Sequence, residues 1–236
     1  MMDASTLPVL SQELLLSMAE ELKLPLLQIA RHAEQTSLSG TIDPVRIQTI
    51  ADSALRLVDN YVLGVRLALE PEELLGESVS VSSVLYDVGQ QLDALAKSYG
   101  VTLELNIGGR YGPVLAHRKG LQAALTSLGA ALIEALPAQG SPQLKLYLAT
   151  HRSRYGIVAG LYADTKQLSN QALQRGRQLQ RSSRQPLTSL THTSGAGVFL
   201  ADTILHAMRL KLSTSRHHHL YGLGTIMQPN HQIQLV

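Results

Sequence analysis

Histidine and serine offer the most distinctive catalytic or metal-binding chemistry in this sequence, because it contains no cysteine. Without thiols, thiolate zinc sites, iron–sulfur clusters and cysteine nucleophiles are excluded. The run His217–His219 is the obvious candidate for a metal site. Successive residues of a strand point to alternate faces, so these three side chains cannot converge on one ion, and we expect an edge strand or a loop there instead. Ser194 and Gly195 precede no strand-to-helix elbow with a paired base, so no hydrolase site is predicted.

The charge of the chain is unevenly distributed. Residues 1–164 carry a net charge of −5 and residues 165–236 carry +7. Five cations lie in one polar segment without an acidic residue: Lys166, Arg175, Arg177, Arg181 and Arg184. Such a segment fits either an anionic partner, which would be an acidic or phosphorylated protein or nucleic-acid phosphates, or a solvated loop. Because no Phe, Tyr or Trp lies between Ala163 and Gly197 to stack on bases, single-stranded nucleic acid is disfavoured.

The composition indicates an ordered globular protein. Of the 236 residues, 44% are hydrophobic, and the net charge is only +2. The N-terminus lacks the basic flank and apolar core of a signal peptide, and no apolar stretch is long enough to span a bilayer. We therefore expect a soluble cytoplasmic protein that does not bind membranes.

Two helical stripes within residues 1–74 predict a helical hairpin. In both, apolar residues recur at alternating spacings of three and four, which is typical of a packing seam. Gly40 can end the first helix, Asp43 can cap the second, and Pro44 suits its first position. A linker this short makes the helices antiparallel, and dimerisation into a four-helix bundle would complete their burial. The first stripe comprises Leu15, Met18, Leu22, Pro25, Ile29 and His32; the second comprises Ile47, Ile50, Ala54, Leu57 and Tyr61.

Residues 75–236 have a different pattern, in which short alternating segments separate amphipathic helices. Helices are predicted from Ser82 or Ser83 to Tyr99, over 119–136 and over 198–209. Strands are predicted around Val79 and over 101–105, 144–148 and 157–161. A loop is expected over 191–197, and the last strands are expected to be broken at His217–His219 and at Gly222 and Gly224. The fold class is α+β, with the helical hairpin followed by an α/β sandwich.

This order resembles the transmitter core of a sensor histidine kinase, in which a dimerisation hairpin precedes an ATP-binding domain. Residues 18–26, Met-Ala-Glu-Glu-Leu-Lys-Leu-Pro-Leu, are similar to the family's H-box, His-Glu-Leu-Arg-Thr-Pro-Leu. Glu20 occupies the position of the phosphoacceptor histidine. The resemblance implies that Glu20, Lys23 and Leu24 lie on a face that docks a response-regulator-like protein.

The remaining motifs of the resemblance fall in the second domain. Ser127 and Ala131 stand where the N-box has asparagines, and Asp164 stands where the family has its adenine-binding aspartate. Gly195 and Gly197 resemble the second glycine box. The Gly222-Leu223-Gly224-Thr225 stretch is similar to a late Gly-x-Gly-Thr turn, and Lys166–Arg184 falls where the ATP lid is expected.

The substitutions remove three elements that the family's chemistry needs. At the phosphoacceptor position Glu20 replaces the nucleophilic imidazole, and it would meet a triphosphate as an anion. Ala131 has no oxygen for Mg²⁺, and Lys166 and Leu168 replace glycines of the Asp-x-Gly-x-Gly loop. His32 lies in register with the apolar stripe, which favours an interior group over an exposed nucleophile. We expect no resident metal and no retained Mg·ATP.

These observations favour a homodimeric, non-catalytic histidine-kinase-like signalling or scaffold protein. One alternative is an atypical kinase or phosphotransferase that relays phosphate through His32 or holds nucleotide through Asp164. A second alternative is a nucleic-acid-associated regulator that uses the basic segment.

Overall fold

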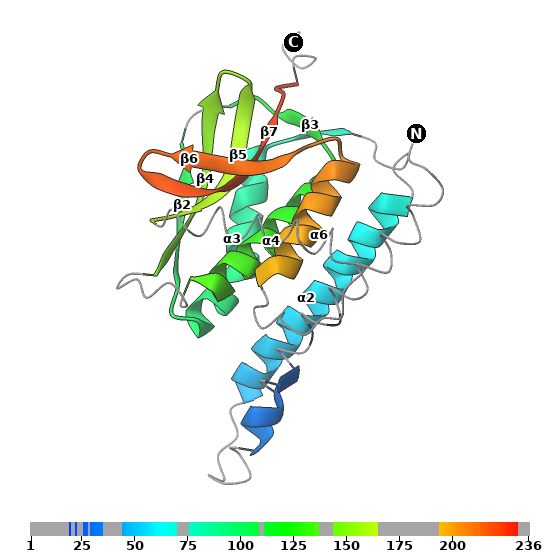
Figure 1. Cartoon of the computed structure of the whole chain (residues 1–236), viewed down its shortest axis with the longest axis vertical. Coiled ribbons are helices and arrows are strands. Elements are labelled where there is room, and N and C mark those ends of the chain that lie inside the picture. The colour runs from blue at the N-terminus through cyan, green and yellow to red at the C-terminus, as the bar shows by residue number, and fades with distance from the viewer. Residues whose placement is uncertain are drawn as a thin grey trace, which may run out of the picture.

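A mixed five-stranded sheet, covered on one face by helices, forms the centre of the molecule in the computed structural model (Figure 1). The structure describes residues 19, 22, 26–27, 29–34, 44–69, 76–108, 111–136, 144–164 and 194–230. The helices are α2 (Pro44–Leu69), α3 (Val81–Ser98), α4 (Arg118–Ala135) and α6 (Ser194–Ala207). The strands are β1 (Glu77–Val79), β2 (Thr102–Ile107), β3 (Val114–Ala116), β4 (Lys145–Ser153), β5 (Gly156–Ala163), β6 (Leu212–His217) and β7 (Leu220–Met227).

The strand order in the sheet is β2-β4-β5-β7-β6. Only β2 and β4 run parallel, and the chain between them passes through β3 and α4. The other neighbours are antiparallel, with Tyr162 of β5 paired to Tyr147 of β4 and to Gly222 of β7. A separate antiparallel pair, β1 with β3, closes one end of the domain. The predicted α+β class is confirmed.

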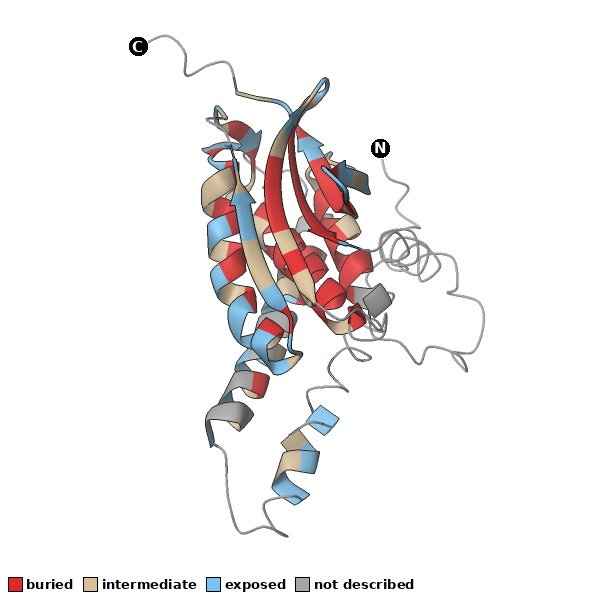
Figure 2. Cartoon of the chain, turned by 90° about the vertical axis from the view of Figure 1, so that its left-hand side faces the viewer, coloured by how far each residue is buried: buried red, intermediate tan, exposed pale blue. Residues whose placement is uncertain are grey.

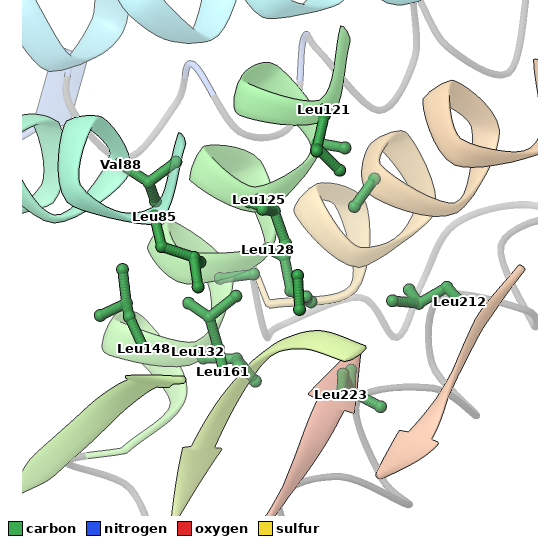
Figure 3. Close-up of a cluster of buried hydrophobic side chains, with 14 of the residues drawn as sticks. Leu85, Val88, Leu121, Leu125, Leu128, Leu132, Leu148, Leu161, Leu212 and Leu223 are labelled. Atoms are coloured by element: carbon green, nitrogen blue, oxygen red, sulfur yellow. The ribbon is translucent and has the colours of Figure 1, made fainter. Parts of the chain in front are cut away.

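A layer of leucines joins the helices to the inner face of the sheet. Figure 3 shows labelled side chains of α3 and α4 facing those of the sheet, and Figure 2 shows the buried residues concentrated between the two layers. Alternation along the strands directs these leucines inward, and α4 is buried around most of its circumference because it lies between α3, α6 and the sheet. The labelled residues are Leu85, Val88, Leu121, Leu125, Leu128, Leu132, Leu148, Leu161, Leu212 and Leu223.

Helix α2 extends along the α6 side of this layer (Figure 1). It begins at Pro44, as predicted, and ends two residues before Pro71. The helical residues 29–34 lie beside its first half in Figures 1 and 2, as expected for the N-terminal hairpin. The predicted seam of α2 is a packing surface: Ile50 and Tyr61 are buried, and Tyr61 belongs to the same apolar cluster as the leucine layer.

Several local predictions were wrong. The cap of α3 is Ser80, whose hydroxyl accepts the Ser83 amide, and not Ser82 or Ser83. The strand β3 was missed because it has only three residues and pairs with β1, 35 or more residues earlier in the chain. Strand β7 runs unbroken through Gly222 and Gly224, because both glycines pair with β5 and neither forms a turn.

Candidate functional site

The segment of α4 that was predicted to resemble the N-box lies inside the protein. Helix α4 is capped by His117, whose Nδ1 accepts the Gly120 amide at 3.0 Å. Ser127 and Ala131 follow about three and four turns after this cap and are only 1% and 2% exposed. The two positions that the N-box resemblance assigns to metal-binding oxygens therefore hold a buried hydroxyl and a methyl group.

The Ser127 hydroxyl is engaged by α2. Asn60 Nδ2 donates a hydrogen bond to Ser127 Oγ at 3.3 Å, across 67 residues of sequence. The neighbouring Thr126 hydroxyl donates to Gln91 Oε1 of α3 at 2.9 Å. Both polar side chains at the centre of α4 thus have protein partners, as buried hydroxyls require.

Apolar packing of α2 on α6 accompanies this hydrogen bond. Tyr61 is 1% exposed and lies in the central core, one residue after Asn60. Gly64 faces α6 so closely that a methyl group there would lie 2.6 Å from Leu200 Cδ1. A glycine at this position lets the two helices approach. The sequence predicted that this stripe would pack, but gave no sign that its partner would be α4 and α6.

Asp164 comes directly after β5, which ends at Ala163. It is exposed, and it follows Ala163, which pairs with Tyr221 of β7. A carboxylate in this place is free to accept a hydrogen bond from a ligand. The predicted role of Asp164 in adenine binding stays a prediction.

The two glycines of the predicted second glycine box lie in a helix. The loop expected over 191–197 is wrong from Ser194 onward, because α6 begins there and includes Gly195 and Gly197 in its first turn. Apolar residues at 198–201 are buried against the core, and this packing outweighs the weak helix propensity of glycine. Gly197 is itself buried.

Several predicted site residues lie outside the described residues. These are the docking positions Glu20, Lys23 and Leu24 and the basic segment Lys166, Arg175, Arg177, Arg181 and Arg184. His32 is described and is half-buried on its helix. No group of three His, Cys, Asp or Glu side chains in the described ranges could hold a metal ion, and no helix there is long and apolar enough to cross a membrane.

The sequence did not predict a second polar group, on the outer face of the sheet. His151 of β4 and His217 of β6 lie with ring centroids 5.2 Å apart, and both rings are near Tyr162, at 6.0 Å and 5.4 Å from its ring. His218, in the turn after β6, packs edge-on against His217 at 4.4 Å. We call His151, His217 and His218 the outer-face histidine cluster. Only the fold reveals it, because 66 residues separate His151 from His217 in the sequence.

Burial sets the electrostatics of this outer face. It lowers the pKa of His151 and of His217, and the charge of His218 lowers both further. Burial also raises the pKa of Tyr162 to about 12, although its hydroxyl hydrogen bonds Ser215 Oγ at 3.1 Å. All three side chains are therefore held toward their neutral forms at neutral pH.

Comparison with known proteins identifies the fold. No family model and no curated protein matches this sequence. Among solved structures, full-length ShkA in complex with AMPPNP is similar over 97% of this chain and 47% of its own, with a TM-score of 0.51 and 11% identity. The chain thus spans about half of that protein.

Two further structures match over nearly their whole length. The histidine kinase AdeS of Acinetobacter baumannii covers 89% of this chain and 98% of its own, with 16% identity and a TM-score of 0.44. A bacterial phosphotransferase covers 95% and 98%, with 10% identity and a TM-score of 0.47. The likeness to ShkA, together with the order of elements described above, shows that this chain shares the fold of the matched part of that protein.

Proposed function

We propose that this protein is a non-catalytic histidine-kinase-like signalling or scaffold protein that acts through self-association and protein docking. The observation that carries this proposal is that two side chains of α4 offer no exposed oxygen to a metal ion. Ser127 is 1% exposed and accepts a hydrogen bond from Asn60, and Ala131 is 2% exposed and has no side-chain oxygen.

Metal-bound nucleotide needs accessible oxygen ligands. Mg²⁺ demands near-octahedral oxygen coordination and is usually held by one or two protein carboxylate or amide oxygens beside the phosphates. To ligate it, Ser127 would have to leave Asn60, and α2 would have to move off the Gly64–Leu200 contact. Ala131 has no side-chain oxygen that could serve as a ligand instead. This favours loss of Mg·ATP binding over its retention.

The exposed side chains of the hairpin support self-association. Leu55 and Val62 of α2 are 63% and 52% exposed and seven residues apart, so they lie on one face of the helix. Val62 follows Tyr61 directly, so it points roughly 100° away from the face that packs on α6. Leu26 and Leu27 on the first helix are also exposed. A second copy of this chain, completing a four-helix bundle, would cover these leucines and Val62.

The partner of this dimer is proposed from the position of the H-box-like segment. Glu20, Lys23 and Leu24 would form a docking face for a response-regulator-like protein. The half-buried His32 keeps the phosphotransferase alternative open, because an imidazole that reaches solvent can accept a phosphoryl group.

The decisive experiment is calorimetric titration of the full chain with Mg·ATP and with Mg·ADP, combined with incubation in labelled ATP. We expect no saturable heat and no labelled protein, and light scattering of the same sample should give the mass of a dimer. The matched control is Asp164→Ala, which should titrate like the natural sequence.

Two results would contradict the proposal. Saturable nucleotide binding that Asp164→Ala abolishes would favour an ATP-binding kinase. Acid-labile label that His32→Gln removes would favour a phosphotransferase. A monomeric mass would contradict the self-association alone.

A further inference from the structure

The outer-face histidine cluster joins two parts of the sheet that are not neighbours. In the strand order, β5 and β7 lie between β4 and β6, so a flat sheet would place β4 about 14 Å from β6. The sheet coils instead, and the tip of the β6–β7 hairpin approaches β4 until the His151 and His217 rings are 5.2 Å apart. The cluster is therefore a tertiary contact that closes the concave outer face.

Two ring nitrogens in this contact are buried and have no hydrogen-bond partner among the described residues. His217 is 7% exposed, and its Nε2 has no hydrogen-bond partner; the buried Nδ1 of His151 also has none. A buried polar atom without a partner costs free energy, so its presence at a contact between elements points to a purpose other than stability. A metal ion is disfavoured, because within the described ranges no three suitable side chains converge.

The titratable and charged groups around these imidazoles come from β4, β5, β6 and the turn after β6. From β4 the titratable neighbours on this face are Tyr147 and Lys145, and Lys145 pairs with Glu104 of β2 at 2.6 Å. From β5 they are Tyr162 and the exposed Asp164 at its end, and from the turn they are His218 and His219. Arg216 Nε donates to the His218 carbonyl, and its guanidinium lies over Tyr221. In the described part of the chain, none of the ion pairs between side chains on this face includes a cluster histidine.

We propose that the outer-face histidine cluster is a pH-sensitive contact that holds the tip of the β6–β7 hairpin against β4 while the imidazoles are neutral and releases it when they are protonated. Two imidazolium ions about 5 Å apart, partly removed from water and without a counterion, repel each other. The repulsion acts between β4 and the hairpin tip, because each carries one of the two rings.

Release of the tip would reach the end of β5. The last residue of β5 that pairs with β7 is Ala163, and its partner is Tyr221. Tyr221 comes one residue after Leu220 at the tip of the hairpin, and Asp164 comes one residue after Ala163. Acidification should therefore loosen the strand pair that positions Asp164, while the leucine layer on the other face stays packed.

The direction of the pH dependence follows from the lowered pKa of both histidines. In the unfolded chain each takes up a proton near its ordinary value of 6.5, whereas the folded chain takes it up only at lower pH. The unfolded state then binds more protons as the pH falls below about 6.5, so stability is complete above that pH and declines below it.

The test is thermal unfolding of the full chain between pH 7.5 and pH 5.0, with His151→Gln/His217→Gln as the variant. Its matched control is His219→Gln, an exposed histidine of the same turn. We expect the natural sequence to lose roughly 5 °C more than the double variant over this range, on the scale of a few degrees per kcal/mol for a protein of this size. The control should behave like the natural sequence.

Direct titration of the imidazoles by nuclear magnetic resonance needs no variant and covers the case in which the double variant does not fold. His151 and His217 should titrate below 6.5, and amide protection of β6 should fall with their protonation before that of α4. Equal pH dependence in the double variant, titration of His217 at or above 6.5, or unchanged β6 protection would overturn the proposal. Stabilisation by Zn²⁺ that the double variant lacks would overturn it in favour of a metal site.

Discussion

The two faces of the central sheet are built on different principles. The inner face is filled with leucines that α3, α4 and α6 cover, and its packing depends on side-chain volume (Figure 3). The outer face is built around Tyr162, which lies over Gly160 and reaches Ser215 of β6 with its hydroxyl. Among the described residues, its small buried cluster consists of Tyr162, Ala149 and Leu220, with Tyr147 at the margin. We therefore expect the inner face to contribute most of the free energy of unfolding. The outer face is the part whose packing conditions such as pH can alter.

The largest effect expected from this comparison comes from a matched pair of leucines. Leu161→Ala opens a cavity in the inner layer and should lower the free energy of unfolding by about 3 to 5 kcal/mol. Leu220→Ala, in the smaller outer cluster, should cost about 2 kcal/mol, because the surrounding hairpin tip can collapse onto the space. Urea denaturation of both variants measures the difference. Equal losses would mean that the two faces contribute alike.

An intermediate effect is expected at Gly160. A methyl group there would lie 2.5 Å from Tyr162 Oη and 2.9 Å from the Leu223 carbonyl oxygen, so the tyrosine must move off the sheet. Gly160→Ala should cost about 1 to 3 kcal/mol, as overpacking does.

The matched control is Gly112→Ala, since a methyl group there meets nothing within 4 Å. Thermal or urea unfolding checks both variants. A Gly160→Ala protein as stable as the control would show that the outer face adjusts without cost.

The smallest effect is expected from Tyr162→Phe. The ring keeps its place over Gly160 and only the hydrogen bond to Ser215 is lost, at a cost of about 1 kcal/mol. Because the Ser215 side chain is only half-buried, water can replace the lost partner. The measurement is again urea denaturation, with Ser215→Ala and the double variant completing a cycle. A coupling energy of zero between the two sites would contradict a direct hydrogen bond.

The proposed function and the pH response fall on different sides of this comparison. The α4 side chains on which the proposed function rests, Ser127 and Ala131, belong to the helical layer on the inner side of the sheet, whereas the histidine cluster lies on the outer side. If the titration shows that Mg·ATP binds, the proposed function is contradicted but the pH-sensitive contact is not. If the double histidine variant has the same pH dependence as the natural sequence, the pH-sensitive contact is contradicted but the proposed function is not.

The sequence by itself determined the elements that depend on local patterns. The spacing of Ile50 and Tyr61 with Pro44 at the first position defined α2, and alternation defined β4 and β5, because helix and strand periods are local properties. The resemblance that places Ser127 and Ala131 at the N-box asparagines also rests on the sequence alone.

Only the tertiary structure decided which surfaces these elements share. That Asn60 would reach Ser127, that Gly222 would pair within a strand, and that His151 would meet His217 all depend on contacts between distant segments. Such contacts follow from the coiling of the sheet and the packing of helices, which side-chain volumes across the whole chain determine together. The pattern of any one segment does not contain that information.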